Sequence, residues 1–92
     1  MFGDAPAATL LSMPMFLLHH QHRPAECEAA FAAWQGFDSP LRRHLAACTC
    51  LDGGHGLWWR VEAPTREAAL ALLPPYIARR TEAIAVRDVQ IP

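Results

Sequence analysis

The sequence predicts a single α+β domain in which a four-stranded antiparallel sheet carries its helices on one face. Three observations support this prediction: short segments with the two-residue alternation of strands, longer segments with helical spacing, and the order of both along the chain. A chain of 92 residues is near the size at which association with a second copy adds needed buried surface. We therefore expect a homodimer.

The composition narrows the class of protein. Hydrophobic residues make up 52% of the chain and charged residues 18%, which predicts a folded chain. A formal net charge of −1 argues against nucleic-acid or membrane-surface partners, and we expect neither a signal peptide nor a membrane span. Three cysteines do not predict a disulfide framework and favour a reducing, cytoplasmic setting. The arginine-rich, lysine-free composition is typical of a bacterial source.

In the first half of the chain, the pattern predicts a strand and a helix after a loose extension at residues 1–13. The domain proper is expected at 14–92, and its first strand at 15–21, between two prolines. Pro24 suits a first helical turn, and Gly36 ends that helix. Ser39 and Pro40 predict a further short turn through residue 45. Apolar residues recur on the helix at Cys27, Ala30, Phe31 and Trp34.

The stretch 51–62 predicts a hairpin between strands at 46–51 and 57–62. With Gly53 and Gly54 as a two-residue turn, Cys50 pairs with Leu57 and Cys48 with Trp59. This pairing predicts that both cysteines lie on the apolar core face. The opposite face is mixed in character and carries Ala47, Thr49, Leu51, Trp58, Arg60 and Glu62.

In the second half, Thr65 is expected to cap a helix through residue 73, which Pro74 and Pro75 break before a restart at 76–80. A last strand follows at 84–91, with a bulge where the alternation slips at Arg87 and Asp88. The resulting order β-α-β-β-α-β, with right-handed crossovers, predicts a ferredoxin-like sheet of strand order 4-1-3-2.

Three short motifs carry a family resemblance: Leu-Leu-His-His at 17–20, Trp-Arg-Val-Glu-Ala at 59–63 and Thr-Arg-Glu-Ala-Ala at 65–69. With this element order, residues 15–92 resemble the small ferredoxin-like proteins that pair sheet to sheet as dimeric α+β barrels. That group includes cofactor-free monooxygenases, lactone isomerases and a nickel-binding family of short actinobacterial proteins. The nickel-binding proteins are the most similar in size and in histidine on the first strand. The resemblance implies a metal ligand at His19 or His20 and contains no catalytic signature.

Histidines gather at the end of the first predicted strand. His19, His20 and His22 are candidate metal ligands, because imidazole is a common neutral ligand. Strand alternation sends His19 to one face and the other two to the opposite face. A joint site of histidine and cysteine is not expected, because the third strand separates the first and second by about 9.6 Å. We therefore expect Cys48 and Cys50 to be packing residues.

The mixed face is the stronger candidate for a ligand site. If the first strand lies beside the third, this face gathers an aromatic and polar set, namely His19, Gln21, Trp58, Arg60 and Glu62. His19 would be the base, Arg60 would hold an anion or carbonyl, and Trp58 would form a wall. In the alternative, Arg60 and Glu62 form cross-strand ion pairs and the face is only a dimer interface. The arginine pairs at 42–43 and 79–80 could form an anion site, but such pairs usually lie on the solvated surface.

We expect a small homodimeric binding or accessory protein. It would hold a small-molecule ligand or a transition-metal ion (nickel, copper or zinc) on the sheet face at the dimer interface. A cofactor-free monooxygenase or isomerase of the same architecture is the first alternative, and a pure protein interaction module is the second. An enzyme requires a base with an oriented neighbour in a deep pocket, whereas His19 has only the residues of the mixed face beside it.

Overall fold

A computed structural model describes residues 13–92 as one antiparallel sheet with short helices, an α+β fold. The extension predicted at 1–13 lies outside the described residues, Met13 excepted. No helix in the described part of the chain is long and apolar enough to cross a membrane. The strands are β1 (Met15–Gln21), β2 (Ala47–Cys48), β3 (Gly56–Glu62) and β4 (Thr81–Val86). The helices are α2 (Cys27–Ala32), α3 (Arg66–Leu70) and α4 (Pro75–Ala78), with 3₁₀ turns η1 (Pro24–Glu26) and η2 (Cys50–Asp52).

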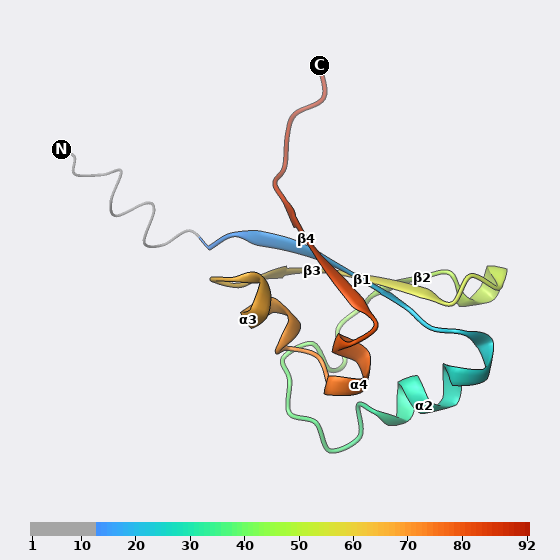
Figure 1. Ribbon diagram of the computed structural model, residues 1–92. Helices are drawn as coiled ribbons and strands as arrows, with labels where there is room; N and C mark the ends of the chain where they lie inside the picture. The colour runs from blue at the N-terminus through green and yellow to red at the C-terminus, as the bar shows by residue number, and fades with distance from the viewer. Residues whose placement is uncertain (1–12) are drawn as a thin grey trace.

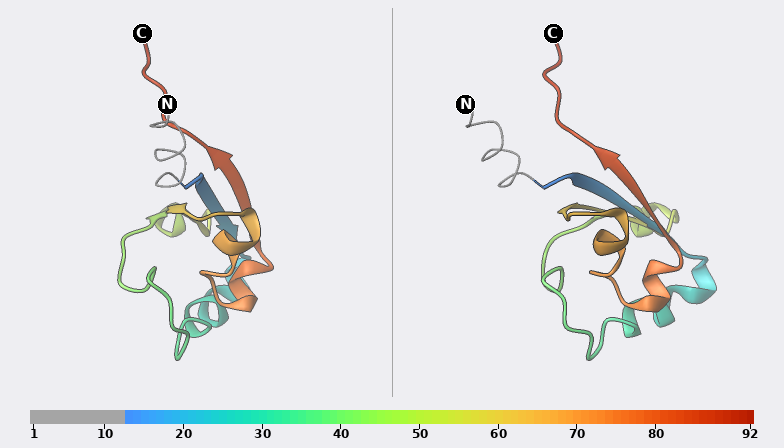
Figure 2. Two further views of the ribbon diagram at one scale, coloured as in Figure 1. Left: turned by 90° about the vertical axis from the view of Figure 1, so that its left-hand side faces the viewer. Right: turned by 60° about the vertical axis from the view of Figure 1, so that its left-hand side comes forward.

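The sheet has the order β2-β3-β1-β4, which is the predicted order counted from the other edge. All neighbouring strands are antiparallel, and Leu18 lies opposite Trp59 on β3 and Ala83 on β4. The three helices gather on one side of the sheet and leave the other side open (Figures 1 and 2). This asymmetry creates a helix face and an open face.

Burial along β1 follows the two-residue period of a strand. Phe16, Leu18 and His20 are buried against the helices, while Leu17 and His19 on the open face are half-buried. The predicted first strand and its two faces are therefore confirmed. The hydrophobic core comprises Phe16, Leu18, Ala30, Trp59, Val61, Ala63, Ala69, Leu73, Ile77 and Ala83.

The helix ends follow the capping signals in the sequence. The Thr65 hydroxyl accepts the N–H of Ala68 at 3.0 Å and starts α3, and Pro74 separates α3 from α4. The first helix begins at Pro24 as η1 and continues as α2. Gly36 follows it with a φ of +74°, a conformation that glycine adopts without strain.

The predicted hairpin turn is wrong, because the loop is longer than two glycines. Thr49 closes it: its N–H donates to the Gly56 carbonyl at 3.0 Å, and its hydroxyl accepts the Gly56 N–H at 3.0 Å. Ala47 consequently faces Trp58 and Cys48 faces Leu57, two residues from the predicted register. Gly54 is required in this loop, since an added Cβ would collide with the Thr49 hydroxyl oxygen that holds Gly56.

The longer loop also overturns the predicted burial of the cysteines. The second strand contains only Ala47 and Cys48, so that Cys48 is exposed, and Cys50 lies half-buried in η2. The predicted last strand is likewise shorter than expected. β4 ends at Val86 without a bulge, and Asp88 instead binds Arg60 at 2.7 Å.

Candidate metal centre

The sheet separates the three predicted histidines as strand alternation requires. His19 lies on the open face, where its ring stacks on Trp58 with a centroid distance of 4.6 Å and an interplanar angle of 7°. His20 and His22 point to the helix face and are both buried. A three-histidine site is therefore not formed.

The open face brings together only part of the predicted ligand site. His19 and Trp58 are in contact, but the Arg60 guanidinium binds the Asp88 carboxylate at 2.7 Å. Arg60 thus forms its ion pair with the C-terminal segment, and not across the strands of the sheet as the interface alternative predicted. Gln21 and Glu62 are exposed at either end of the face.

The buried histidines lead to a different group of side chains at the end of β1. Gln21 pairs with Gly56, and one residue further His22 lies opposite His55, whose carbonyl accepts the His22 N–H at 3.3 Å. The two imidazole rings lie 5.4 Å apart, edge to face. His55 has a φ of +51°, a left-handed conformation in which histidine is enriched among non-glycine residues.

Cys50 completes the group, which we call the His22/Cys50/His55 cluster. One ligand atom from each residue lies within 4.8 Å of the other two. A joint histidine and cysteine site was not expected, because Cys50 was assigned to the second strand. That assignment is wrong, because η2 carries Cys50 beyond the strand, into the same loop as His55.

Neither His55 nor Cys50 was among the predicted ligands. A signal for His55 was present, because antiparallel pairing of the first and third strands at the observed register places it opposite His22. Cys50 had no such signal. Its position depends on a 3₁₀ turn rather than on a periodic element.

Two ring nitrogens of the cluster are buried without a hydrogen-bond partner among the described residues. They are Nε2 of His22 and Nδ1 of His55. Unpaired buried nitrogens are costly, and a bound cation would satisfy both. Zinc bonds of about 2.0 Å to nitrogen and 2.3 Å to sulfur at tetrahedral angles would place the donor atoms about 3.3–3.6 Å apart. The ligand atoms of the three residues now lie up to 4.8 Å apart, and side-chain movements of about 1 Å would bring them to the distances that zinc requires.

A chain of hydrogen bonds fixes which His22 nitrogen is free. The Thr81 hydroxyl donates its single proton to the Ile77 carbonyl at 2.6 Å, so it can only accept from Nδ1 of His20 at 3.3 Å. Neutral His20 then accepts at Nε2 from Nδ1–H of His22, at 2.9 Å. The lone pair of His22 consequently lies on Nε2, the nitrogen of the cluster. Outer residues that orient a ligand histidine in this way are typical of metal sites.

The environment of His20 and His22 favours the neutral form of both side chains by lowering their pKa. Burial is the main cause that lowers the pKa of His20, and the neighbouring His22 adds to it. Burial and the proximity of His55 lower the pKa of His22, against the opposing effect of Glu26. Neutral imidazole is the form that binds metal. In contrast, a hydrogen bond with Cys48, together with burial, raises the pKa of Cys50 to about 11, so that Cys50 is a thiol until a metal displaces its proton.

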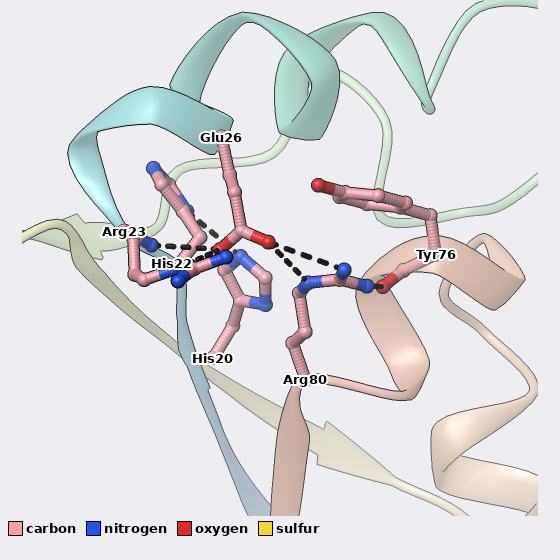
Figure 3. Close-up of polar contacts among 6 residues, drawn as sticks. All are labelled: His20, His22, Arg23, Glu26, Tyr76 and Arg80. Atoms are coloured by element: carbon pink, nitrogen blue, oxygen red, sulfur yellow. Dashed lines mark hydrogen bonds and ion pairs between the residues drawn. The ribbon is translucent and has the colours of Figure 1, made fainter.

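The turn after His22 is anchored by one carboxylate. Figure 3 shows Glu26 between the Arg23 backbone, whose N–H donates at 2.9 Å, and the Arg80 guanidinium, whose nitrogens lie 3.2 and 3.3 Å from it. Arg80 also lies over the Tyr76 ring at 3.8 Å. These donors lower the pKa of Glu26, with the Arg23 N–H as the largest cause. The anchor joins η1 to the start of β4 and so holds the segment that carries His22.

Comparison of the chain with protein-family models, with curated proteins and with solved structures found no match. The function is therefore inferred from the side chains and their geometry.

Proposed function

We propose that the protein binds one transition-metal ion, zinc or copper, through His22, Cys50 and His55. The observation that carries this proposal is the convergence of three donor groups in which each imidazole has one buried ring nitrogen without a hydrogen-bond partner among the described residues. The metal-binding role expected from the sequence is thereby retained, but the site moves from the open sheet face to the loop at the end of β1 and β3.

The donor set favours zinc and copper over nickel. Thiolate ligands select zinc and copper(I), and imidazole binds both metals as well as nickel. Hard cations such as magnesium prefer oxygen ligands, which the cluster lacks. Three protein ligands leave one tetrahedral position for water or an exchanging ligand. An open position of this kind suits a protein that binds and transfers metal as an accessory to another protein.

We further propose that the domain is ferredoxin-like. The strand order β2-β3-β1-β4 and the placement of α2 after β1, and of α3 and α4 after β3, on one face support this assignment. The resemblance to dimeric α+β barrels supports a homodimer paired through the open face. Trp58 and Leu17, half-buried there, are the side chains that a partner would cover.

The open face supports a second candidate role, that of a small-ligand site at the dimer interface. Nε2 of His19 is buried and has no hydrogen-bond partner among residues 13–92, although its ring is held flat against Trp58. A polar ligand or a residue of a second copy would satisfy that nitrogen.

Isothermal titration calorimetry with zinc and copper tests the metal proposal. Wild type should bind one ion per chain, and Cys50→Ala and His55→Ala should each lose at least about 100-fold in affinity, since removal of a ligand costs more than the 10–100-fold typical of outer-shell residues. His19→Ala is the matched control, being a histidine outside the cluster. The proposal fails if Cys50→Ala binds as tightly as wild type or if His19→Ala abolishes binding.

A further inference from the structure

A cavity of about 320 Å³ lies on the helix face, between the sheet, α2 and the segment at 41–46. Its walls are apolar and aromatic: Trp34 and Trp59 line it with ring centroids 6.0 Å apart, and Leu57 and Ile77 add aliphatic surface. Small-molecule sites begin at about 300 Å³. The cavity therefore has room for a ligand of roughly ten non-hydrogen atoms, given about 30 Å³ for each water molecule in the liquid.

The charge along this cavity is positive and comes from one segment. Arg42 and Arg43 line it beside His44, and no carboxylate does. Neither arginine takes part in an ion pair within the described part of the chain; Arg42 has only a 3.5 Å contact with the Phe37 carbonyl. The sequence favoured solvated surface for this arginine pair, and both side chains are exposed; they also line the apolar cavity.

The sheet side of the cavity offers no free titratable group. His20 is the other ionisable residue in the lining, and both of its nitrogens are used, by His22 and by Thr81. A ligand with a polar head must therefore direct that head to the arginines and its apolar body to the tryptophans. Phe31 also lines the cavity and is 54% exposed, a large apolar side chain that a bound ligand would cover.

We propose that this cavity binds a small apolar monoanion, with its carboxylate or similar acid group on Arg42 and Arg43 and its hydrocarbon or aromatic body against the wall that Trp34 and Trp59 form. Guanidinium groups bind carboxylates through paired, charge-assisted hydrogen bonds, which an alcohol or an amine cannot reproduce. The site is distinct from the His22/Cys50/His55 cluster, and its occupation does not depend on a bound metal.

The test is a tryptophan-fluorescence titration with three probes of equal chain length: octanoate, octan-1-ol and octylammonium. Octanoate should change the emission of Trp34 and Trp59 and bind at least about 10-fold more tightly than octanol, with octylammonium the weakest. The response should persist in Trp58→Phe, because Trp58 lies on the open face and does not line the cavity.

Three variants test the contribution of the arginine charges to binding separately from that of the cavity volume. Arg43 has a φ of +69°, so Arg43→Gly removes the guanidinium at a position whose backbone suits glycine. Arg43→Gly combined with Arg42→Gln should lower the affinity for octanoate by about 10-fold or more and leave that for octanol unchanged. Ala46→Leu, which fills the cavity, should weaken both probes. Arg79→Gln, an exposed arginine outside the lining, is the control and should bind as wild type does.

Thermal unfolding of each variant establishes that it is folded before binding is compared. The proposal is overturned if octanol binds as tightly as octanoate, if the double arginine variant keeps full affinity, or if none of the probes binds to wild type. Octanoate binding that survives in His55→Ala, a variant that should lose zinc, supports a site independent of the metal centre. Loss of octanoate binding in that variant would refute the independence of the two sites.

Discussion

Raising the pH from about 6.5 to about 8 should tighten zinc binding by about 30-fold, because the metal must displace a proton from Cys50. The pKa of Cys50 is raised to about 11 by its hydrogen bond with Cys48 and by burial. At pH 7 about one molecule in 10⁴ carries the thiolate, so each bound zinc ion releases about one proton and the affinity rises about 10-fold per pH unit. Burial and the proximity of His55 lower the pKa of His22, which reduces the number of protons that this histidine releases over the range.

Calorimetry in two buffers that differ in ionisation enthalpy counts the released protons directly. Wild type should release about one proton per zinc ion at pH 7. Cys48→Ala should bind zinc more tightly than wild type at that pH, because the variant removes the largest cause of the raised Cys50 pKa. A pH-independent affinity, or the same proton release in Cys50→Ala as in wild type, would refute the assignment of the thiol as a ligand.

Three further outcomes are expected. Thr81→Val should weaken zinc binding by about 10-fold, since His20 loses the acceptor that fixes its tautomer. Urea unfolding should show a loss of only about 1 kcal/mol in the free energy of unfolding, while calorimetry measures the zinc affinity. An unchanged zinc affinity would contradict the hydrogen-bond chain from Thr81 through His20 to His22. Glu26→Gln should unfold at a lower urea concentration than wild type at pH 7, because the stabilisation by Arg80 requires the carboxylate. The urea midpoints of the two proteins should converge as the pH falls below 4.5 and through the lowered pKa of Glu26. Equal midpoints at pH 7 would exclude a stabilising ion pair between Glu26 and Arg80. Light scattering should give twice the chain mass of 10.2 kDa for wild type and a monomer for Trp58→Glu, whereas a monomeric wild type would rule out pairing through the open face.

Periodic features of the fold could be predicted from the sequence. The alternation at 15–21 identifies β1 and its faces, and Trp59 and Val61 lie in the core as their spacing requires. The double proline at 74–75 separates α3 from α4, as expected from the missing backbone donors. These predictions succeed because each depends on residues close together in the chain.

Predictions that depended on a turn or on a distant partner failed. Two glycines are the usual signal of a two-residue hairpin, but Thr49 closes a longer loop with both its backbone and its hydroxyl. Arg87 and Asp88, where a bulge was predicted, lie beyond the end of β4 and belong to no strand. Asp88 binds Arg60, and no local pattern near Asp88 indicates that contact.

In the candidate site, too, the residue on a periodic element was predicted and the residues in the loop were not. His22 was recognised from the sequence because it directly follows β1, and it lies opposite the loop that carries His55 and Cys50. The predicted use of His19 with Trp58 placed two residues correctly in contact, but on the face away from the buried nitrogens of the cluster. Cys50 reaches the cluster because the loop contains a 3₁₀ turn, and hairpin geometry with the shorter turn places its sulfur in the core instead.

X-ray absorption spectroscopy of the zinc-loaded protein tests the metal centre most directly, because it reports the donor atoms themselves. Three protein ligands from His22, Cys50 and His55 predict one sulfur at about 2.3 Å and two imidazole nitrogens at about 2.0 Å, with a further light atom in the open position. The same spectrum for Cys50→Ala should lack the sulfur. A shell of nitrogen and oxygen alone in wild type, or two sulfur atoms per zinc ion, would contradict the proposed centre.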